Sequence, residues 1–377
     1  MYAITNVNVF DGVEIHHNQI IIIENDTITR VISNNETMDM QLPDVQIDGK
    51  GYLATAGFID LQLNGCGGVL LNTDPSLKTL DIMNKTNLKT GTTQFLPTFI
   101  TSDQQAMENI VSIVGELDQP ETHGVLGLHL EGPFISIEKK GAHRQEFIRE
   151  LDLPTARFFA QNADKIRVLT VAPENTSQEA IDIVRNAGIT VSLGHTNATY
   201  AQVCEKNGLE MATHLYNAMT PLGSREPGVV GYIFDKKPHA GIIVDGIHAD
   251  YPSVRIAHQL MGEKLFMVTD AVTPAGTDMT EYDMAGVKAY VTNGKCHYED
   301  GTIAGAAITM IEGVRNLIQH VGLSREEALR MASLYPAKAI KIDDSYGKIA
   351  EGYKANIVLL NDNNQVEHIF QMGRQEF

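Results

Sequence analysis

Four polar residues each end a separate apolar run in the middle of this chain, and this repeated placement constrains the fold more than any other feature. The runs and their polar residues are GVLGLHLEGPF with Glu131, ITVSLGHT with His195, EMATHLYNAM with His214, and LFMVTDAVTPAG with Asp270. Short apolar runs bounded by loop-like sequence are predicted strands. Polar side chains at the carboxyl ends of parallel strands are typical of catalysis rather than packing.

The middle of the chain alternates between predicted strands and helices. Helical patterns that follow a Ser or Thr occupy residues 102–117 and 177–188, and two more helices are expected after the last strand. Eight strands with intervening helices predict an α/β fold of the (β/α)8 TIM barrel type. An open doubly wound sheet is the alternative, but the Gly-rich dinucleotide turn that such a sheet often carries is absent. The eight predicted strands are 57–64, 92–98, 124–132, 166–174, 189–196, 210–217, 239–248 and 265–271.

The two ends of the chain differ from the middle in their pattern of predicted secondary structure. Residues 1–53 read as short β-branched strands with turn signals between them, and residues 345–377 resume that style. We therefore predict a small discontinuous β-sandwich domain made of 1–53 and 345–377. Residues 54–344 form the predicted barrel domain, which carries the four strand-end polar residues.

The composition restricts the class of partner and the compartment. The chain of 377 residues has a formal net charge of -18 and no Lys/Arg cluster, so we expect no nucleic-acid partner. An anionic small molecule would need a local positive pocket. The apolar stretch Ile20 to Ile23 is too short to span a bilayer, so no membrane association is expected. Cys66, Cys204 and Cys296 lie far apart without a CxxC spacing, which favours a reducing, cytoplasmic location.

Three of the strand-end residues have the chemistry of a metal site. Glu131, His195 and His214 offer one carboxylate and two imidazoles, which suits zinc and leaves a fourth position open for water. Each residue alone is as well explained by a structural role, and it is their common position at neighbouring strand ends that favours a metal. Asp270 is then the candidate for proton transfer, with an N-cap or turn role as its alternative.

Four other residues are candidates for contact with a substrate or for support of the site. Asp245 and His248 end the seventh predicted strand, and Asp245 can equally orient a neighbour or cap a loop. His143 lies in the long loop after Glu131, where active-site residues of barrels are common. Arg225, in GSREPG, is the best candidate for binding a phosphate or carboxylate, although a solvent-exposed loop Arg is the commoner case.

At this point the motifs resemble a known family. AGFIDLQLNGCGG, GLHLEGPF, SLGHTNATY, ATHLYNAMTPLGSREPG, DGIHAD and VTDAVTPAG are similar to those of the amidohydrolase superfamily, in its single-metal deacetylase branch. The resemblance covers essentially the whole chain. It implies hydrolysis of the acetamide of N-acetylglucosamine-6-phosphate to glucosamine-6-phosphate and acetate, a step of amino-sugar catabolism.

The resemblance also implies roles for individual residues. It implies one divalent metal ion per subunit, with zinc expected, held by Glu131, His195 and His214. Asp270 matches the catalytic acid and base, and the implied assembly is a homodimer in which a neighbouring subunit can supply the phosphate-binding Arg. The implied contacts to the amino-sugar phosphate are His143 at the sugar, His248 near the reacting group, Asn217 and Ala218 at the sugar phosphate, and Arg225 at the phosphate.

The sequence departs from the superfamily pattern in ways that bear on the metal count. Many amidohydrolases carry His-x-His at the end of the first strand, whereas this chain has Gln62 and Asn64, and neutral amides are poor zinc ligands. The run VLTVAPE offers no Lys for a bridging carboxylate, which counts against dihydroorotase-like or urease-like activity. Asn356 stands where many relatives have Asp, which concerns the small domain.

Two rival functions stay open at this point. The enzymatic rival is hydrolysis of a different N-acyl amine, such as an acylamino acid, which would not need the phosphate. The other is a catalytically silent barrel that binds or scaffolds. A silent barrel is expected to have lost a site residue, and a sugar-phosphate sensor would not need Asp270.

Overall fold

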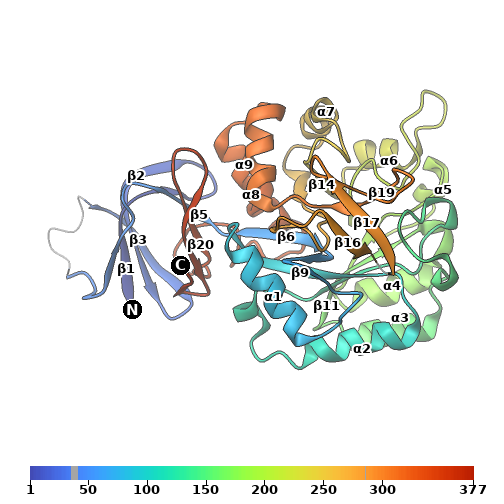
Figure 1. The fold of residues 1–377 in the computed structure, drawn as a ribbon, viewed down its shortest axis with the longest axis horizontal. Coiled ribbons are helices and arrows are strands. Elements are labelled where there is room, and N and C mark those ends of the chain that lie inside the picture. Colours follow the sequence, from blue (N-terminus) through green and yellow to red (C-terminus); the bar gives the residue numbers. More distant parts are fainter. Residues whose placement is uncertain (35–40, 285) are drawn as a thin grey trace.

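The computed structural model describes residues 1–34, 41–284 and 286–377, which form a large barrel and a smaller sheet beside it (Figure 1). The small sheet combines the start of the chain, drawn in blue, with its end, drawn in red. No helix within these described ranges is long and apolar enough to cross a membrane. The barrel carries all the predicted site residues.

Eight parallel strands form the barrel, as the sequence predicts. Their order in space follows the order in the chain, and β6 and β15 come together at a parallel bridge between Leu63 and Ala271 that closes the ring. Because all eight strands are parallel, their carboxyl ends open at one mouth. The strands are β6 (Phe58–Leu63), β9 (Thr92–Ile100), β10 (Leu128–Glu131), β11 (Ile166–Val171), β12 (Thr190–Leu193), β13 (Met211–Ala212), β14 (His239–Ile243) and β15 (Leu265–Val268).

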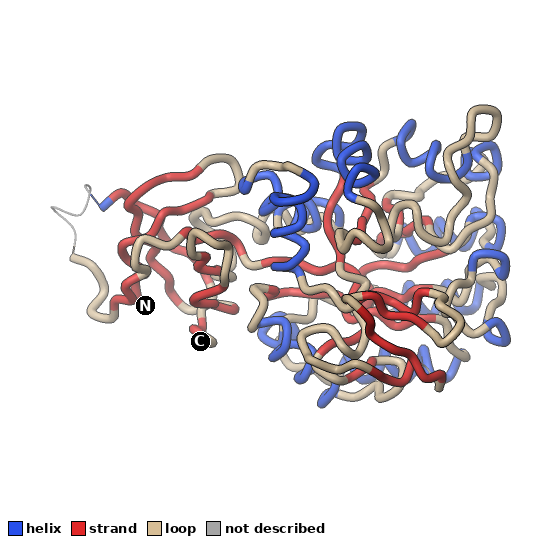
Figure 2. Tube along the Cα trace, turned by 45° about the horizontal axis from the view of Figure 1, so that its top comes forward, coloured by secondary structure: helices blue, strands red, loops and turns tan. Residues whose placement is uncertain are grey.

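Helices cover the outside of the barrel and separate successive strands (Figure 2). Several begin at a side-chain cap: Ser177 accepts a hydrogen bond from the backbone N–H of Ala180, and Asp103 accepts one from Ala106. The cap of the second helix is therefore Asp103, not the Ser or Thr at the start of the pattern that the sequence suggested. The helices are α1 (Leu77–Leu88), α2 (Gln104–Gly115), α3 (Leu153–Gln161), α4 (Gln178–Asn186), α5 (Tyr200–Cys204), α6 (Gly228–Lys236), α7 (Tyr251–Met261), α8 (Met310–Asn316), α9 (Arg325–Ala332) and α10 (Leu334–Ala339).

A four-stranded antiparallel sheet lies between β15 and α8, and the sequence analysis did not predict it. Its last strand reaches the barrel mouth, where Ala306 bridges Ala271 in parallel. The dipeptide Asn293-Gly294, with φ of 51° and 79°, joins two of its strands and is a recognised hairpin signal that could have revealed them. The strands are β16 (Glu281–Met284), β17 (Val287–Thr292), β18 (Lys295–His297) and β19 (Ile303–Ala306).

The small sheet joins the two ends of the chain through β5, which pairs with β1 on one side and β20 on the other. Its two halves also share an apolar core, in which Ile21 and Ile28 pack with Ile357 and Phe370. Because β5 extends to Ala56, the small sheet reaches three residues past 53, and the boundaries at 53/54 and 344/345 stay a prediction. The strands are β1 (Tyr2–Phe10), β2 (Ile15–Glu24), β3 (Thr27–Ser33), β4 (Gln46–Asp48), β5 (Leu53–Ala56), β20 (Ile357–Leu360), β21 (Val366–Gln371) and β22 (Arg374–Gln375).

Candidate active site

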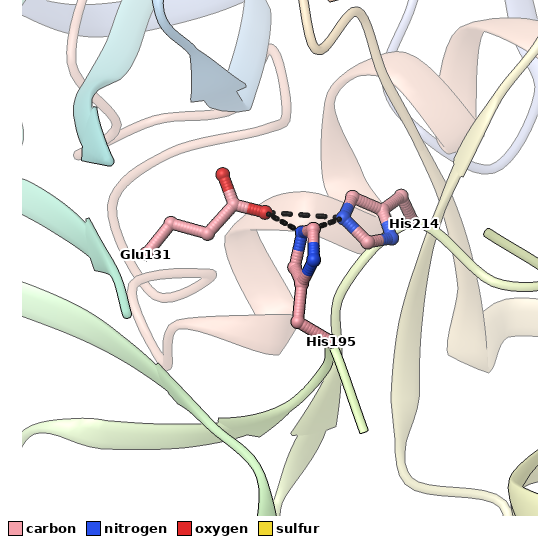
Figure 3. Close-up of side chains that lie close together, drawn as sticks. All are labelled: Glu131, His195 and His214. Atoms are coloured by element: carbon pink, nitrogen blue, oxygen red, sulfur yellow. Dashed lines mark hydrogen bonds and ion pairs between the residues drawn. The ribbon is translucent and has the colours of Figure 1, made fainter. Parts of the chain in front are cut away.

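Glu131, His195 and His214 converge at the barrel mouth (Figure 3). The Nε2 atoms of His195 and His214 lie 3.1 Å and 3.0 Å from Oε1 of Glu131, and they lie 3.0 Å from each other. All three side chains are buried, with at most 6% of any residue exposed. The sequence placed these residues on three different strands, and the barrel brings them to one point.

The donor chemistry of this cluster fits a metal cation. Nδ1 of His195 lies 2.8 Å from the carbonyl oxygen of Lys139, which can accept but not donate, so Nδ1 carries the proton. In the neutral ring Nε2 is then a lone-pair donor aimed at Glu131 and His214. A carboxylate oxygen and two imidazole nitrogens can meet at these distances only if positive charge lies among them, as extra protons or as a metal ion.

The charge on Glu131 supports the same interpretation. Burial raises the pKa of this carboxyl, but its contacts with the rings of His195 and His214 outweigh burial and hold the pKa well below its ordinary value. The carboxylate is therefore ionised and able to bind a cation. In the described part of the chain, this trio is the one group of three or more Asp, Glu, His or Cys side chains with ligand atoms close enough to share an ion.

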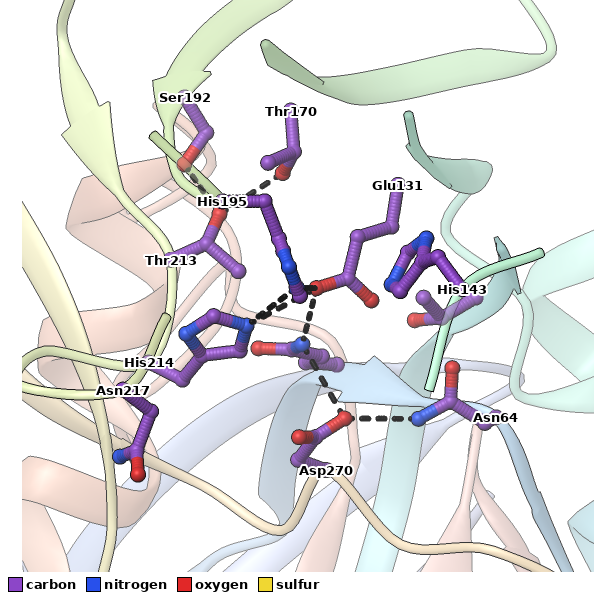
Figure 4. Close-up of polar contacts among 12 residues, drawn as sticks. Asn64, Glu131, His143, Thr170, Ser192, His195, Thr213, His214, Asn217 and Asp270 are labelled. Atoms are coloured by element: carbon purple, nitrogen blue, oxygen red, sulfur yellow. Dashed lines mark hydrogen bonds and ion pairs between the residues drawn. The ribbon is translucent and has the colours of Figure 1, made fainter. Parts of the chain in front are cut away.

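Asp270 lies beside the cluster, at the end of β15 (Figure 4). Its Oδ1 accepts hydrogen bonds from the side-chain amides of Asn64 at 2.7 Å and Gln62 at 3.1 Å. Burial, followed by the negative charge of Glu131, raises the pKa of Asp270 to about 6. A carboxyl group with that pKa can both accept and return a proton near neutral pH.

The backbone turns sharply at three of these four residues. The φ angles are 48° at His195, 32° at His214 and 49° at Asp270, in the left-handed region that side-chain-bearing residues rarely occupy. Each of the three follows the last residues of its strand, so the unusual φ redirects the chain as it leaves the strand. Strained backbone of this kind concentrates at functional sites, because the surrounding structure must hold it.

A cavity of about 210 Å³ opens over the cluster and gathers eight of the nine site residues predicted from the sequence. His143 reaches it from the loop after β10, where Nδ1 lies 2.7 Å from Oγ1 of Thr101 and the ring packs 4.3 Å from the ring of His195. Burial lowers the pKa of His143 to about 3, so its imidazole is neutral. The eight residues are Glu131, His143, His195, His214, Asn217, Ala218, His248 and Asp270.

Arg225 is the predicted residue that the fold does not bring to this cavity. It is exposed, and it lies in a loop before α6 with Leu222, which is 58% exposed. The same stretch of chain, yellow-green in Figure 1, projects from the edge of the barrel. Within a single chain, this Arg does not line the pocket that it was predicted to serve.

A chain of hydroxyl groups lies in the barrel interior below the site, and the sequence analysis did not identify it. His129 donates from Nδ1 to the carbonyl oxygen of Leu61, and burial lowers the pKa of its ring to about 4, so its Nε2 accepts a hydrogen bond from Thr170. Thr213 then donates to Thr170 and Ser192 to Thr213, at 2.7 Å and 2.6 Å (Figure 4). His129, Ser192 and Thr213 each precede a member of the Glu131, His195 and His214 cluster along the sequence, so these hydrogen bonds fix how those strand ends are spaced.

The fold and this site define the class of the protein. The sequence profile of the Amidohydrolase family matches residues 53–375, and that of the NagA composite domain matches residues 1–51. The chain belongs to the amidohydrolase family.

Among its relatives, an N-acetylglucosamine-6-phosphate deacetylase of Haemophilus influenzae is 44% identical over 371 residues, which is 97% of this chain and 96% of that protein. An N-acetylgalactosamine-6-phosphate deacetylase of a Shewanella strain is 36% identical over 84% of this chain and 82% of its own length. The crystal structure of N-acetylglucosamine-6-phosphate deacetylase from Pasteurella multocida superposes with a TM-score of 0.93 at 42% identity, and the match covers 100% of this chain and 99% of that one.

Proposed function

We propose that the protein hydrolyses the acetamide of N-acetylglucosamine-6-phosphate to glucosamine-6-phosphate and acetate, as a step of amino-sugar catabolism. The observation that carries the proposal is the placement of Asp270 beside the Glu131, His195 and His214 cluster in one cavity. The near-full-length relationship to the Haemophilus influenzae deacetylase supports the choice of substrate. The presence of Asp270 argues against a silent binding protein or sensor, because binding alone would not need it.

A single divalent metal ion, with zinc the expected one, would be held by Glu131, His195 and His214. When bound, such an ion lowers the pKa of water and stabilises negative charge on a carbonyl oxygen. Zinc is expected because a carboxylate with two imidazoles is a common catalytic zinc set, although manganese, iron and cobalt tolerate the same ligands. Gln62 and Asn64 turn their amide nitrogens toward Asp270, and an amide N–H group cannot bind a cation, so these side chains present donors where a second metal would need lone pairs.

The protein side chains handle the proton. Asp270 takes a proton from the attacking water as the water oxygen bonds to the acetamide carbon. The same proton passes to the amine nitrogen as the C–N bond breaks, which releases acetate and the free amine. His248 lines the cavity and would contact the carbonyl oxygen as negative charge develops there, a contact that requires a proton on the ring nitrogen that faces the oxygen.

The phosphate group is the second part of the proposal. Asn217 and Ala218 line the cavity and would contact the sugar phosphate, while His143 lines the sugar site. Arg225 is exposed and away from its own cavity, so it would bind the phosphate in the cavity of a neighbouring subunit of a homodimer. Leu222, before α6, is 58% exposed, and Ile256 and Leu260, on the neighbouring α7, are 52% and 42% exposed, so these apolar side chains are candidates for the interface. We place this dimer in the cytoplasm, on the strength of its three widely spaced cysteines.

The test is acetate release from N-acetylglucosamine-6-phosphate by metal-stripped full-length protein, with and without added zinc. N-acetylglucosamine serves as the control without phosphate, and N-acetylgalactosamine-6-phosphate tests the epimer that the Shewanella relative is named for. Zinc-dependent turnover that requires the phosphate and prefers the gluco epimer is expected. Turnover of neither phosphate sugar by protein with bound metal would exclude this substrate and favour another N-acyl amine.

A further inference from the structure

We propose that Gln62 and Asn64 are positioning residues, whose amides hold Oδ1 of Asp270 so that Oδ2 is the oxygen that exchanges the proton. This inference rests on the proposed function and deepens it by assigning the acid and base role to one atom. It also gives a role to the two residues that stand where many amidohydrolases carry metal-binding histidines.

The hydrogen bonds to Asp270 all fall on the same oxygen. Oδ1 accepts from Nδ2 of Asn64 at 2.7 Å and from Nε2 of Gln62 at 3.1 Å (Figure 4). Among the described residues, none forms a hydrogen bond to Oδ2. An oxygen that already accepts two N–H groups has little capacity left for a further proton, so the other oxygen is the better base.

The two amides cannot easily turn away from these contacts. A carboxylate is only an acceptor, so each amide must present its nitrogen to Asp270. The side chains have little room to move, because Gln62 is 2% exposed and Asn64 is 4% exposed. The backbones are joined as well: the N–H of Asp270 donates to the carbonyl oxygen of Gln62 at 2.9 Å, and that of Asn64 donates to Ala271 at 2.9 Å.

Gln62 also links Asp270 to the metal ligands. Its Nε2 lies 3.0 Å from Oε1 of Glu131, the oxygen that both histidines contact, and a primary amide has one proton for each carboxylate. The amide therefore stands between two negative charges that would otherwise repel each other. Among the described residues, Asp270 is the one hydrogen-bond partner of the Asn64 side chain, which makes Asn64 the cleaner residue for an experiment.

Loss of this orientation is expected to lower kcat more than it raises KM. An acid or base must lie within hydrogen-bond reach of the proton that it moves, and an error of about 1 Å can lower the rate about a hundredfold. Substrate binding depends on the phosphate and sugar contacts, which these amides do not make in the proposed arrangement. A residue that merely supported the fold would lower stability without acting through Asp270.

The experiment compares Asn64→Leu, Asp270→Asn and the double variant with the wild-type full chain, each loaded with zinc and assayed on N-acetylglucosamine-6-phosphate. Asn64→Leu is expected to lower kcat at least about tenfold and to keep KM within about twofold, with metal content per chain unchanged. In the Asp270→Asn background the same substitution is expected to have no further effect on kcat, because residues that act as a unit are not additive. Residual acetate release over long incubations gives the rate of the weak variants.

Asn84→Leu is the matched control, because Asn84 is a buried amide on α1 whose side chain bonds Gln371, away from the cavity. It is expected to lower stability and leave kcat near the wild-type value. If Asn64→Leu does not fold, Asn64→Ala removes the same donor without adding volume at the site. An unchanged kcat, or the same loss of kcat in both backgrounds, would overturn the inference. Failure of the proposed function is a different result, in which the wild type itself releases no acetate.

Discussion

Oδ2 of Asp245 accepts a hydrogen bond of 2.6 Å from Nδ1 of the His248 ring and so fixes the orientation of that ring. The other oxygen, Oδ1, accepts the backbone N–H groups of Ile247 and His248, so the carboxylate also fixes the turn that follows β14. The carboxylate is an acceptor, so Nδ1 carries a proton and Nε2 is the ring nitrogen left for the cavity. The sequence had left open whether Asp245 contacts substrate, orients a neighbour or caps a loop, and in the structure it does the last two.

Replacement of Asp245 by Asn should weaken catalysis through His248. An amide can present its oxygen to Nδ1, but it lacks the negative charge that strengthens this hydrogen bond and holds the ring in place. We expect kcat/KM to fall roughly ten- to a hundredfold, as for other residues that orient a site histidine, with zinc content unchanged. Steady-state kinetics and metal analysis on the same preparations measure both quantities. A wild-type kcat/KM would show that His248 does not need its partner.

The pH dependence of turnover should reflect Asp270. Its pKa is raised to about 6 by burial and by the charge of Glu131, and the base must be ionised to accept the proton of water. Activity is therefore expected to be lost as the pH falls through this pKa and to be retained above it. A cation held by Glu131 lowers the pKa of Asp270, because positive charge favours the ionised carboxylate. The kcat/KM of the zinc enzyme should therefore show an acid limb for one proton at or below pH about 6. A limb centred above pH 7 would contradict the assignment.

Removal of the metal should be visible in stability as well as in activity. An ion that binds only the folded chain stabilises it by about 4 kcal/mol when its free concentration is about a thousand times Kd. Thermal unfolding of the stripped protein should therefore shift upward on titration with zinc, and Glu131→Gln should remove most of that shift. Glu146→Gln, which changes an exposed carboxylate of the nearby loop, is the matched control. An equal shift in all three proteins would place the zinc elsewhere.

The sequence was sufficient to predict that Glu131, His195 and His214 lie together, because each stands alone at the end of an apolar run and parallel strands share one mouth. The hydrogen-bond partners were not predictable in the same way. Gln62 and Asp270 lie 208 positions apart, so their contact depends on the closure of the barrel between β6 and β15. Local sequence likewise does not reveal that His195 and His214 adopt positive φ, because that conformation is imposed by the surrounding fold.

The four-stranded sheet β16 to β19 shows a different limit of prediction from the sequence. Its strands are three to six residues long, and several of their side chains face solvent. They therefore lack the long apolar run by which a strand is usually predicted. Met284 and Ile303 nevertheless line the cavity. Short exposed strands are best predicted from their turns, and in this sheet the dipeptide Asn293-Gly294 is the hairpin signal.

The hydroxyl chain below the site should contribute measurably to stability. Thr213→Val keeps the shape of the side chain but leaves Ser192 without its acceptor and Thr170 without one donor, both in the buried interior. Orphaned buried groups of this kind cost about 1–3 kcal/mol. Urea unfolding of the metal-free protein measures the loss, and Thr302→Val, at an exposed position, is expected to stay within about 0.5 kcal/mol of wild type. Equal stability of the two variants would mean that water replaces the missing hydroxyl.

The trans role of Arg225 can be tested by mixing two inactive chains. Arg225→Ala keeps its own Asp270 but would deprive its neighbour of the phosphate contact, and Asp270→Asn has the opposite defect. If the Arg serves the neighbouring subunit, a mixed dimer contains one site with both residues intact and one with neither. Co-expressed at equal levels with random pairing, half of the dimers are mixed, so about a quarter of all sites are restored.

The expected result is therefore about a quarter of wild-type kcat per chain at a phosphate-sugar concentration that saturates the wild type, from two chains that are each weak alone. Sedimentation analysis of the same preparation establishes that dimers are present. If Arg225 instead served its own cavity after a movement of the loop, no mixed site would gain anything, because each chain would keep its own defect. Activity equal to the mean of the two parent variants, in a preparation shown to be dimeric, would exclude the trans arrangement.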